Sequence, residues 1–364
     1  MKLLYITNGI NGSGGLERVL SVKASYLADT LGYEVHIMTL NDSNTNLFYE
    51  FSPSIQLHDI KVYGNPIRYV LNYLSGIKKV IKQINPDVIL VCDDGLKAFF
   101  LPLLLGKKRP LIYERHVSKI IAIGQHDGLI KTIFNRFKFL LMDVLGGTYD
   151  KFVVLTEENR NEWKNNNVIV ISNPLSFFSE DSAPLTAKKV IAVGKQSYQK
   201  GYDRLLASWK EVVAIHPDWV LEIYGKFDEN QGLPELVSEL GLTNQVFFFE
   251  PVKNIQEKYF ESSIYVMSSR FEGFGMVLIE AMACGVPCVS FDCPYGPSDI
   301  IKYNEDGFLV ENGNISLFAQ RILQLIENDS LRKQMGSQAK NNVQRFLPNV
   351  IVNQWHELFK SLVK

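Results

Sequence analysis

The sequence predicts an α/β protein of two doubly wound domains, each a parallel sheet with helices on both faces. Its 364 residues are long for one domain and fit two of about 150 to 200 residues. Short apolar segments of strand length alternate with segments of helical periodicity, which is typical of parallel sheets with right-handed crossovers. A Pro-, Ser- and acid-rich segment, 173–184, separates two such series and predicts a linker.

The first series begins with a strand, a glycine-rich loop, a helix and a second strand. Residues 3–7 are an apolar run, and residues 8–15 contain four glycines. A helix is predicted for 16–31, because apolar residues recur at helical spacing and Gly32 follows. Further strands are expected at 35–40, 55–57, 87–91, 111–114 and 152–155, with helices at 67–84 and 128–144.

The second series has the same alternation and ends in three helices. Pro348 interrupts the helical pattern, so we expect the last helix to run from about 350 to 362. The other expected strands are 190–193, 220–224, 246–249, 264–267 and 289–291, and the other expected helices are 203–215, 235–240, 315–326 and 331–343.

Composition and charge are those of an ordinary globular protein, with 46% hydrophobic and 21% charged residues and a net charge of −1. Residues 1–172 have a net charge of +4 and residues 173–364 of −5. The first half therefore suits an anionic membrane surface or a phosphate, although scattered surface charge explains the difference equally well. We expect no signal peptide, and the longest apolar run, near 98–105, is too short to span a bilayer.

Four cysteines lie in segments predicted to be strands or helices. Three of them cluster between 284 and 293, but no His lies near enough to complete a zinc-binding spacing. We therefore expect reduced cysteines in the core, no metal site and a cytoplasmic protein. The four are Cys92, Cys284, Cys288 and Cys293.

The stretch 268–299 places two acids around a short apolar helix. Glu272 lies in a glycine-rich loop after a strand, and Glu280 lies within the helix, which Gly285 and Pro287 end. A carboxylate among apolar residues costs free energy unless something binds it, so we expect Glu280 to hold a pair of ligand hydroxyls. The alternatives are an internal ion pair for Glu280 and a helix N-terminal cap for Glu272.

Three more loops follow predicted strands, at the ends where ligands bind in open α/β sheets. The loop that contains Gly14 and Gly15 presents backbone N–H groups before a helix and suits an anion, or is a flexible turn. Lys195 and Lys200 begin the second domain and would neutralise a diphosphate, unless they are solvated surface lysines. His116 follows the strand at 111–114, and a lone His is more often structural.

Together these loops resemble the retaining sugar-nucleotide glycosyltransferases of family 4, which have the GT-B fold. The family's two acids with seven residues between them match Glu272 and Glu280, its glycine-rich loop matches 14–18, and its basic loop matches 194–201. The resemblance covers nearly the whole chain. It implies a Rossmann-like acceptor domain, 1–172, and a donor domain, 173–349, facing a cleft, with the final helix (about 350–364) crossing back to the first domain.

The resemblance also implies a role for each motif residue. Glu272 would contact the transferred sugar, His116 would lie near its anomeric carbon, and Lys195 and Lys200 would hold the diphosphate. The family usually has Arg at position 195, so Lys195 offers a point charge without bidentate contact. Glu280 would bind the ribose. The other implied binding residues are Gly14, Gly15, Arg18, Gly194, Gly225, Val252, Phe274, Gly275, Met276 and Val277.

The implied reaction is transfer of a hexose or N-acetylhexosamine from a UDP-sugar, with retention, to a glycan or a polyprenyl-diphosphate-linked sugar. GDP remains an alternative nucleotide. No Asp-rich loop is evident, so we expect no metal or other cofactor, and no nucleic-acid partner. The alternatives are a sugar-nucleotide epimerase of the same fold and a non-catalytic nucleotide-sugar binding module. A nicotinamide oxidoreductase is disfavoured because Glu17 stands where the dinucleotide motif needs a glycine.

The predicted helix 128–144 mixes basic and apolar residues. Lys131, Arg136 and Lys138 alternate with large apolar side chains, and Lys107-Lys108-Arg109 adds charge. Such a helix could lie on the anionic inner face of the plasma membrane, or it could be a core-facing amphipathic helix.

Overall fold

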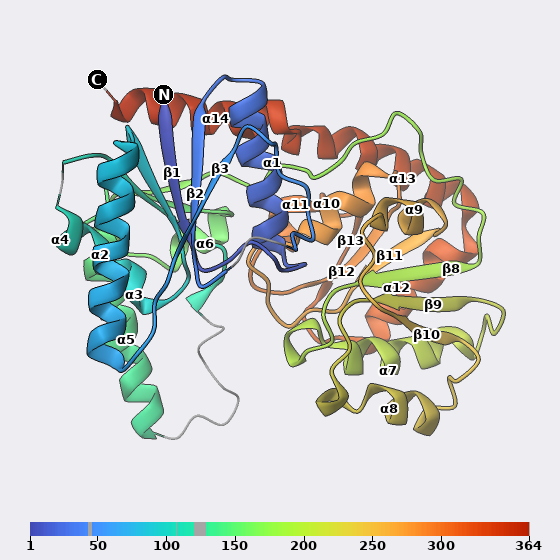
Figure 1. Cartoon of the computed structure of the whole chain (residues 1–364). Helices are drawn as coiled ribbons and strands as arrows, with labels where there is room; N and C mark the ends of the chain where they lie inside the picture. The colour runs from blue at the N-terminus through green and yellow to red at the C-terminus, as the bar shows by residue number, and fades with distance from the viewer. Residues whose placement is uncertain (43–45, 107, 120–128, 364) are drawn as a thin grey trace. The chain divides into compact units, whose positions relative to one another are not determined.

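The computed structural model describes residues 1–42, 46–106, 108–119 and 129–363 (Figure 1). The chain divides into two compact units. The N-terminal unit comprises Met1–Ser176 together with Pro348–Lys364, and the C-terminal unit comprises Phe177–Leu347. Each unit is a parallel sheet with helices on both faces. The predicted doubly wound α/β fold is therefore confirmed.

The sheet of the N-terminal unit has seven parallel strands in the order β3-β2-β1-β4-β5-β6-β7. Tyr5 of β1 lies opposite Ile37 on one side and Leu90 on the other. The strand order reverses beside β1, so the loops that follow β1 and β4 open at the switch point where doubly wound sheets bind ligands. The strands are β1 (Lys2–Thr7), β2 (Glu34–Leu40), β3 (Gln56–Ile60), β4 (Val88–Cys92), β5 (Leu111–Glu114), β6 (Lys151–Val154) and β7 (Val168–Val170).

Helices cover both faces of this sheet. One face packs on an aromatic cluster that includes Tyr73, Phe99, Phe152 and Trp163, and the other face meets α1 and α14. The apolar run at 98–105 forms the short helices α3 and α4. The helices are α1 (Gly15–Asp29), α2 (Pro66–Ile84), α3 (Leu96–Phe99), α4 (Leu101–Leu105), α5 (Leu129–Gly146), α6 (Glu157–Asn161) and α14 (Pro348–Leu362).

The C-terminal helix α14 belongs to the N-terminal unit, as predicted. It begins at Pro348 rather than near residue 350, because proline fits the first turn of a helix, where its missing N–H has no partner to lose. The helix packs on α1, and the Tyr33 hydroxyl lies 2.8 Å from Nδ1 of His356.

A buried ion pair connects α1, β5 and α14. The Lys23 ammonium lies 2.5 Å from both carboxylate oxygens of Glu114 and 4.1 Å from the centre of the Trp355 ring. Both charged side chains are only 1% exposed. Burial alone would raise the pKa of Glu114, but Lys23 and then His116 outweigh it and hold that pKa well below its usual range.

The sheet of the C-terminal unit has six parallel strands in the order β10-β9-β8-β11-β12-β13. Its core packs around Trp209, Phe291 and Phe318. The strands are β8 (Lys189–Val193), β9 (Val220–Tyr224), β10 (Val246–Phe249), β11 (Ile264–Met267), β12 (Cys288–Asp292) and β13 (Gly307–Glu311).

The helices of the C-terminal unit lie close to their predicted positions where they are long. The four cysteines of the chain are buried and free of disulfides. The longer helices are α7 (Tyr202–Val213), α8 (Leu233–Glu239), α9 (Ile255–Phe260), α10 (Met276–Ala283), α12 (Ile315–Glu327) and α13 (Asp329–Asn342). The shortest helices are the 3₁₀ helices η2 (Tyr198–Lys200), η3 (Glu229–Gln231) and η4 (Val343–Phe346) and the α-helix α11 (Pro297–Ile300).

We predict that Lys23→Met lowers the free energy of unfolding by about 3 kcal/mol, because it leaves the Glu114 carboxylate buried without its cation. Urea unfolding followed by circular dichroism measures this. Lys2→Met is the control, since the exposed pair of Lys2 with Glu34, 3.0 Å apart, contributes less than about 1 kcal/mol. Equal losses in the two variants would contradict the prediction.

Candidate active site

An ion pair joins two loops at the carboxyl edge of the C-terminal sheet. Nζ of Lys200, in η2, lies 2.7 Å from Oε1 of Glu272, in the loop between β11 and α10. The Ser269 hydroxyl donates to the same oxygen at 2.5 Å, and the Glu272 backbone N–H donates to the Pro294 carbonyl at 2.6 Å. The Glu272 side chain is therefore held in a fixed position with a cation beside it.

Further hydrogen bonds connect the same two loops. The Gln199 side chain donates to the Phe271 carbonyl at 3.0 Å, and the Arg270 N–H donates to the Gln199 carbonyl at 2.7 Å. The Ser268 hydroxyl donates to the Lys200 carbonyl at 2.8 Å. These contacts hold the basic loop after β8 against the acidic loop after β11, which places Lys200 and Glu272 in one site.

Gly194 and Gly225 directly follow the adjacent strands β8 and β9 and let the two backbones approach closely. A Cβ on Gly225 would lie 1.9 Å from the Gly194 carbonyl oxygen, so no larger residue fits there without a shift of the backbone. The Tyr202 hydroxyl donates to the same carbonyl at 2.8 Å. Lys195 follows Gly194 and is exposed, and no ion pair involves it among the residues that the structure describes.

The N-terminus of α10 opens beside Glu272. Gly275 caps the helix with a φ of 100°, which favours glycine, and Met276 and Val277 form its first turn. Backbone N–H groups in a first turn have no partner within the helix and attract an anion. The Phe274 side chain is buried against Phe346, 5.6 Å between ring centres, so only its backbone can serve a ligand.

Glu280 is fully buried in α10, with 0% of its surface exposed. Its Oε2 lies 3.4 Å from the Tyr259 hydroxyl, which is also 3.4 Å from the Val277 carbonyl oxygen. Tyr259, on α9, was not predicted as a site residue, because its own segment contains no motif.

An aromatic pair lies beside the two residues expected to border the base. Tyr224 and Phe249, the last residues of β9 and β10, stack with ring centres 4.8 Å apart. Gly225 follows Tyr224 and donates its N–H to the Phe249 carbonyl at 2.9 Å, while Val252 is half-buried in the loop after β10. The pair was also missed, because aromatic residues at strand ends usually indicate packing.

The four remaining predicted residues lie in the N-terminal unit. Gly14 caps α1, Gly15 begins it, and the Arg18 guanidinium lies 4.9 Å from the centre of the Tyr49 ring. The Glu17 side chain folds back over the loop, so that a Cβ on Gly14 would lie 2.6 Å from one of its oxygens. A carboxylate therefore lies where the loop was expected to offer an anion site.

His116 follows β5 and belongs to the network around Glu114. Its Nε2 lies 3.2 Å from Oε1 of Glu114, without the geometry of a hydrogen bond, and its backbone N–H donates to Asp94 at 3.3 Å. The Cys92 thiol donates to Glu114 at 3.3 Å, and burial first, then Glu114, raises the pKa of that thiol. Cys92, Glu114 and His116 are residue types that bind metal ions, and their potential ligand atoms lie within 4.8 Å of one another. The Lys23 ammonium, however, already contacts both Glu114 oxygens.

Two family models match the chain. A model for glycosyl transferases of group 1 matches residues 176–342, and a glycosyl transferase 4-like model matches residues 17–141. The chain is 32% identical to the amylovoran biosynthesis glycosyltransferase AmsD of Erwinia amylovora, over 98% of this chain and 99% of that protein. It is 30% identical to an uncharacterized glycosyltransferase of Haemophilus influenzae, over 97% and 98% of the two chains.

Solved structures share the fold at lower identity. Anabaena HepE in complex with UDP-glucose has a TM-score of 0.79 at 18% identity, and all of both chains is covered. Sucrose-phosphate synthase of Thermosynechococcus elongatus has a TM-score of 0.84 at 17% identity, over 100% and 99% of the chains. The chain therefore belongs to the GT-B glycosyltransferases of the group 1 and family 4 type, which confirms the fold and the family that the resemblance implied.

We predict that Gly225→Ala lowers the free energy of unfolding by about 3 kcal/mol, because its methyl group would overlap the Gly194 carbonyl. Gly241→Ala is the matched control. Gly241 has a φ of 73° and open space around it, so only the backbone cost of about 1 kcal/mol applies. Denaturant unfolding of both variants measures the difference, and a Gly225 variant as stable as the Gly241 variant would show that the two strand ends separate easily.

Proposed function

We propose that this glycosyltransferase moves a hexose or N-acetylhexosamine from a UDP-sugar to a hydroxyl of a bacterial surface glycan or its lipid-linked precursor. The observation that supports it most is the Lys200–Glu272 pair, held beside the N-terminus of α10. The names of related proteins also support it, among them an amylovoran biosynthesis glycosyltransferase and a poly(ribitol-phosphate) α-N-acetylglucosaminyltransferase of Staphylococcus aureus.

The diphosphate of the donor would lie between the lysines and α10. Negative charge grows on this group as the sugar leaves, so fixed cations and N–H dipoles lower the barrier. Lys200 is held in place by its contact with Glu272, and exposed Lys195 is free to close on the phosphates. Because these lysines can neutralise the leaving group, we propose that transfer needs no metal, and that EDTA leaves the rate unchanged.

Glu280 would accept hydrogen bonds from the ribose hydroxyls, with the Tyr259 hydroxyl beside it. The base would lie by Gly225 and Val252, next to the stacked Tyr224 and Phe249. A carboxylate inside an apolar helix recovers its desolvation cost only through such hydrogen bonds.

Glu272 would orient the transferred sugar rather than attack it. Its Oε1 already accepts from Lys200 and Ser269, which lowers its nucleophilicity. Retention would then arise when the acceptor approaches on the face that the diphosphate leaves and the phosphate takes the acceptor's proton. His116, whose Nε2 lies beside Glu114, would border the anomeric carbon.

The activity test is incubation of the full chain with UDP-glucose, UDP-galactose and their N-acetyl forms, with release of UDP measured. We predict that Lys200→Met lowers the rate about 100-fold, because it removes a cation from the leaving group. Lys333→Met, an exposed lysine of α13, should leave the rate unchanged.

Other outcomes would identify the two alternative functions. Interconversion of the UDP-sugars without UDP release would indicate an epimerase. Binding of a UDP-sugar without any turnover, with or without acceptor glycans, would indicate a binding module. Equal rates in the two lysine variants would contradict the role proposed for Lys200.

We also propose that the N-terminal unit rests on an anionic membrane. The outward face of α5 exposes apolar residues at helical spacing, including Phe134 and Phe137, each 63% exposed, beside Lys131, Arg136 and Lys138. A different face of α5, which carries Met142 and Leu145, packs on the core. Two residues of the predicted basic helix and loop, Gly128 and Lys107, lie outside the described residues.

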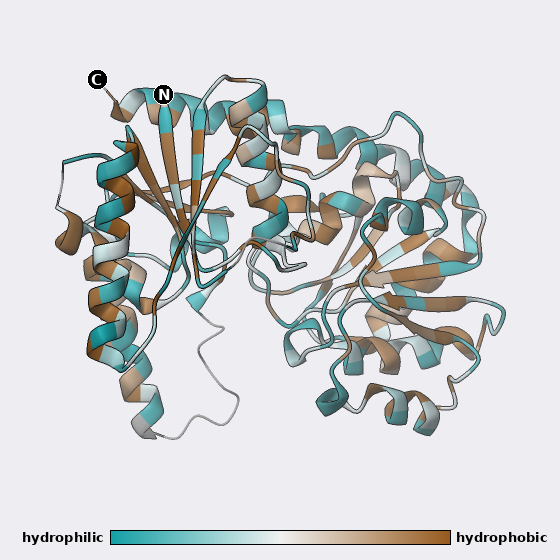
Figure 2. Cartoon of the chain, in the orientation of Figure 1, coloured by the Kyte–Doolittle hydropathy of each residue, from teal (hydrophilic) through white to brown (hydrophobic). Residues whose placement is uncertain are grey.

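Helix α2 also exposes apolar and basic residues. Ile67 is 73% exposed and Leu71 61%, and both lie in the first two turns of α2, a helix on which hydrophobic and hydrophilic residues alternate (Figure 2). The helix contains no acidic residue, but four basic ones. Among the described residues no helix is long and apolar enough to cross a bilayer. Peripheral contact with the inner leaflet is therefore the mode we propose.

We predict that the chain pellets with vesicles that contain phosphatidylglycerol and that salt weakens this binding. The double variant Phe134→Asp/Phe137→Asp should reduce partitioning about tenfold or more, since each buried aromatic ring contributes on the order of 2 kcal/mol. Ile215→Asp, at a similarly exposed apolar residue of the C-terminal unit, is the control. No pelleting of the wild-type chain would remove membrane contact from the proposal.

A further inference from the structure

Two histidines face each other at the outer edge of the N-terminal sheet. Nδ1 of His36, in β2, lies 2.9 Å from Nε2 of His58, in β3. The ring centres are 5.2 Å apart, close to the nitrogen separation plus the two ring radii, so the hydrogen bond between the rings is nearly straight. β3 is an edge strand with β2 as its neighbour. The histidine pair therefore connects an edge strand to the rest of the sheet.

The neighbours of His36 decide where its hydrogens lie. Its Nε2 is 3.0 Å from Oε1 of Glu34, and a carboxylate only accepts hydrogen bonds. Glu34 stays charged, because hydrogen bonds with Lys2 and then with His36 hold its pKa below its usual range. Nε2 of His36 therefore carries a hydrogen, and the other ring nitrogen shares one proton with His58.

The pair can hold one positive charge but not two. A hydrogen bond between two ring nitrogens needs one donor and one acceptor, so one nitrogen must be without hydrogen. A second positive charge would set two N–H groups and two cations against each other at 2.9 Å. His36 is only 3% exposed, so water screens this repulsion poorly. Burial first, and then His36, accordingly lower the pKa of His58.

The charges around the pair offer little compensation. The same face of the sheet packs on α2, since Met38 and Ile60, two residues after the histidines, belong to one apolar cluster with Val80 of that helix. Helix α2 contains no acid, and its basic residues are exposed. Glu34 is therefore the acid that lies against the pair. The other charged residues of these elements are Lys2, Asp59 paired with Lys61, Arg68, Lys78, Lys79 and Lys82.

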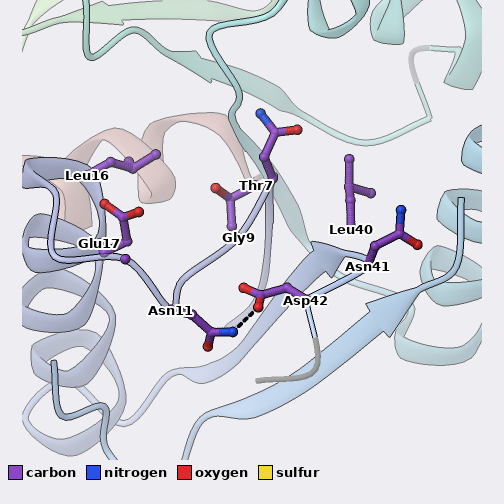
Figure 3. Close-up of a pocket in the computed structure, with 10 residues that line it drawn as sticks. Thr7, Gly9, Asn11, Leu16, Glu17, Leu40, Asn41 and Asp42 are labelled. Carbon is purple, nitrogen blue, oxygen red and sulfur yellow. Dashed lines mark hydrogen bonds between the residues drawn. The ribbon is translucent and has the colours of Figure 1, made fainter. Parts of the chain in front are cut away.

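The carboxyl ends of the same two strands support the loop after β1. The Asp42 N–H donates to the Asp59 side chain at 3.0 Å. The Asp42 carboxylate in turn accepts from the Ile10 N–H at 2.7 Å and from the Asn11 side chain (Figure 3). The position of the edge strand therefore affects the glycine-rich loop.

We propose that the His36–His58 pair is a pH-sensitive contact that holds β3 on β2 near neutral pH and releases it in mild acid. A histidine in an unfolded segment takes up a proton near pH 6.5, whereas the paired histidines do not take up a second one. The released strand therefore binds one more proton, so pairing is lost as the pH falls below about 6.5, by up to about tenfold per pH unit.

Release of β3 would also withdraw Asp59 from Asp42 and so loosen the loop after β1. The histidines lie toward the opposite end of the strands, so the effect on this loop is transmitted through β3. The proposal does not rest on the proposed function, because it concerns the pairing of two strands and no substrate.

The test is hydrogen–deuterium exchange of the full-length protein at pH 7.5 and pH 5.5, corrected for the intrinsic exchange rate of each amide. We expect the protection of the β3 amides and of the Ile10 amide to fall about tenfold or more in acid, while protection in the central strand β1 changes less than about twofold. His58→Gln keeps a hydrogen-bonding group but cannot be protonated, so its β3 protection should change less than about twofold. His216→Gln, at a half-buried histidine of the C-terminal unit, is the control and should behave like the wild type.

Three results would overturn the proposal. They are β3 protection that does not fall in the wild type, an equal fall in His58→Gln, and an equal fall in β1, which would indicate global unfolding. NMR of the wild type with labelled histidines keeps the test valid if the variant does not fold. The Cε1–H signals of His36 and His58 should together report uptake of one proton before β3 opens, and two complete titrations with β3 still protected would contradict the proposal.

Discussion

The candidate site depends on the ion pair between Lys200 and Glu272. It joins a loop after β8 to a loop after β11, and hydrogen bonds from Gln199 and Ser268 support the same junction. The cation that a leaving diphosphate needs and the carboxylate that a sugar hydroxyl needs are therefore held together before substrate binds. Such preorganisation is what makes electrostatic stabilisation effective in catalysis.

In the N-terminal unit, Glu114 connects several elements, as the Lys200–Glu272 pair does in the C-terminal unit. Its carboxylate contacts Lys23 of α1, Cys92 of β4 and His116 of the following loop. The ring of Trp355, on α14, packs against the Lys23 ammonium. The C-terminal helix thus contributes to the environment of His116 through Lys23 and Glu114. In both units a buried carboxylate is held by a lysine from another element.

The fold class and the motif loops could be predicted because they depend on local sequence. Glycines before helices, acids in an apolar helix and alternating segments are visible within short windows. The strands β7 and β13 were not predicted, because β7 has only three residues and β13 begins at a glycine, Gly307, a residue type disfavoured in strands. The two ion pairs could not be predicted either. Lys200 and Glu272 are 72 positions apart in the sequence, and Lys23 and Glu114 are 91 positions apart. Their contact depends on the order of strands in the sheet.

The most direct test of the account is a crystal structure of the chain with UDP bound. We predict that the diphosphate lies within hydrogen-bond distance of Nζ of Lys200 and of the N–H groups at Met276 and Val277. We also predict that both ribose hydroxyls donate to the Glu280 carboxylate. A diphosphate bound instead at the loop of Gly14 and Gly15, or a ribose that leaves Glu280 buried against Tyr259, would contradict it.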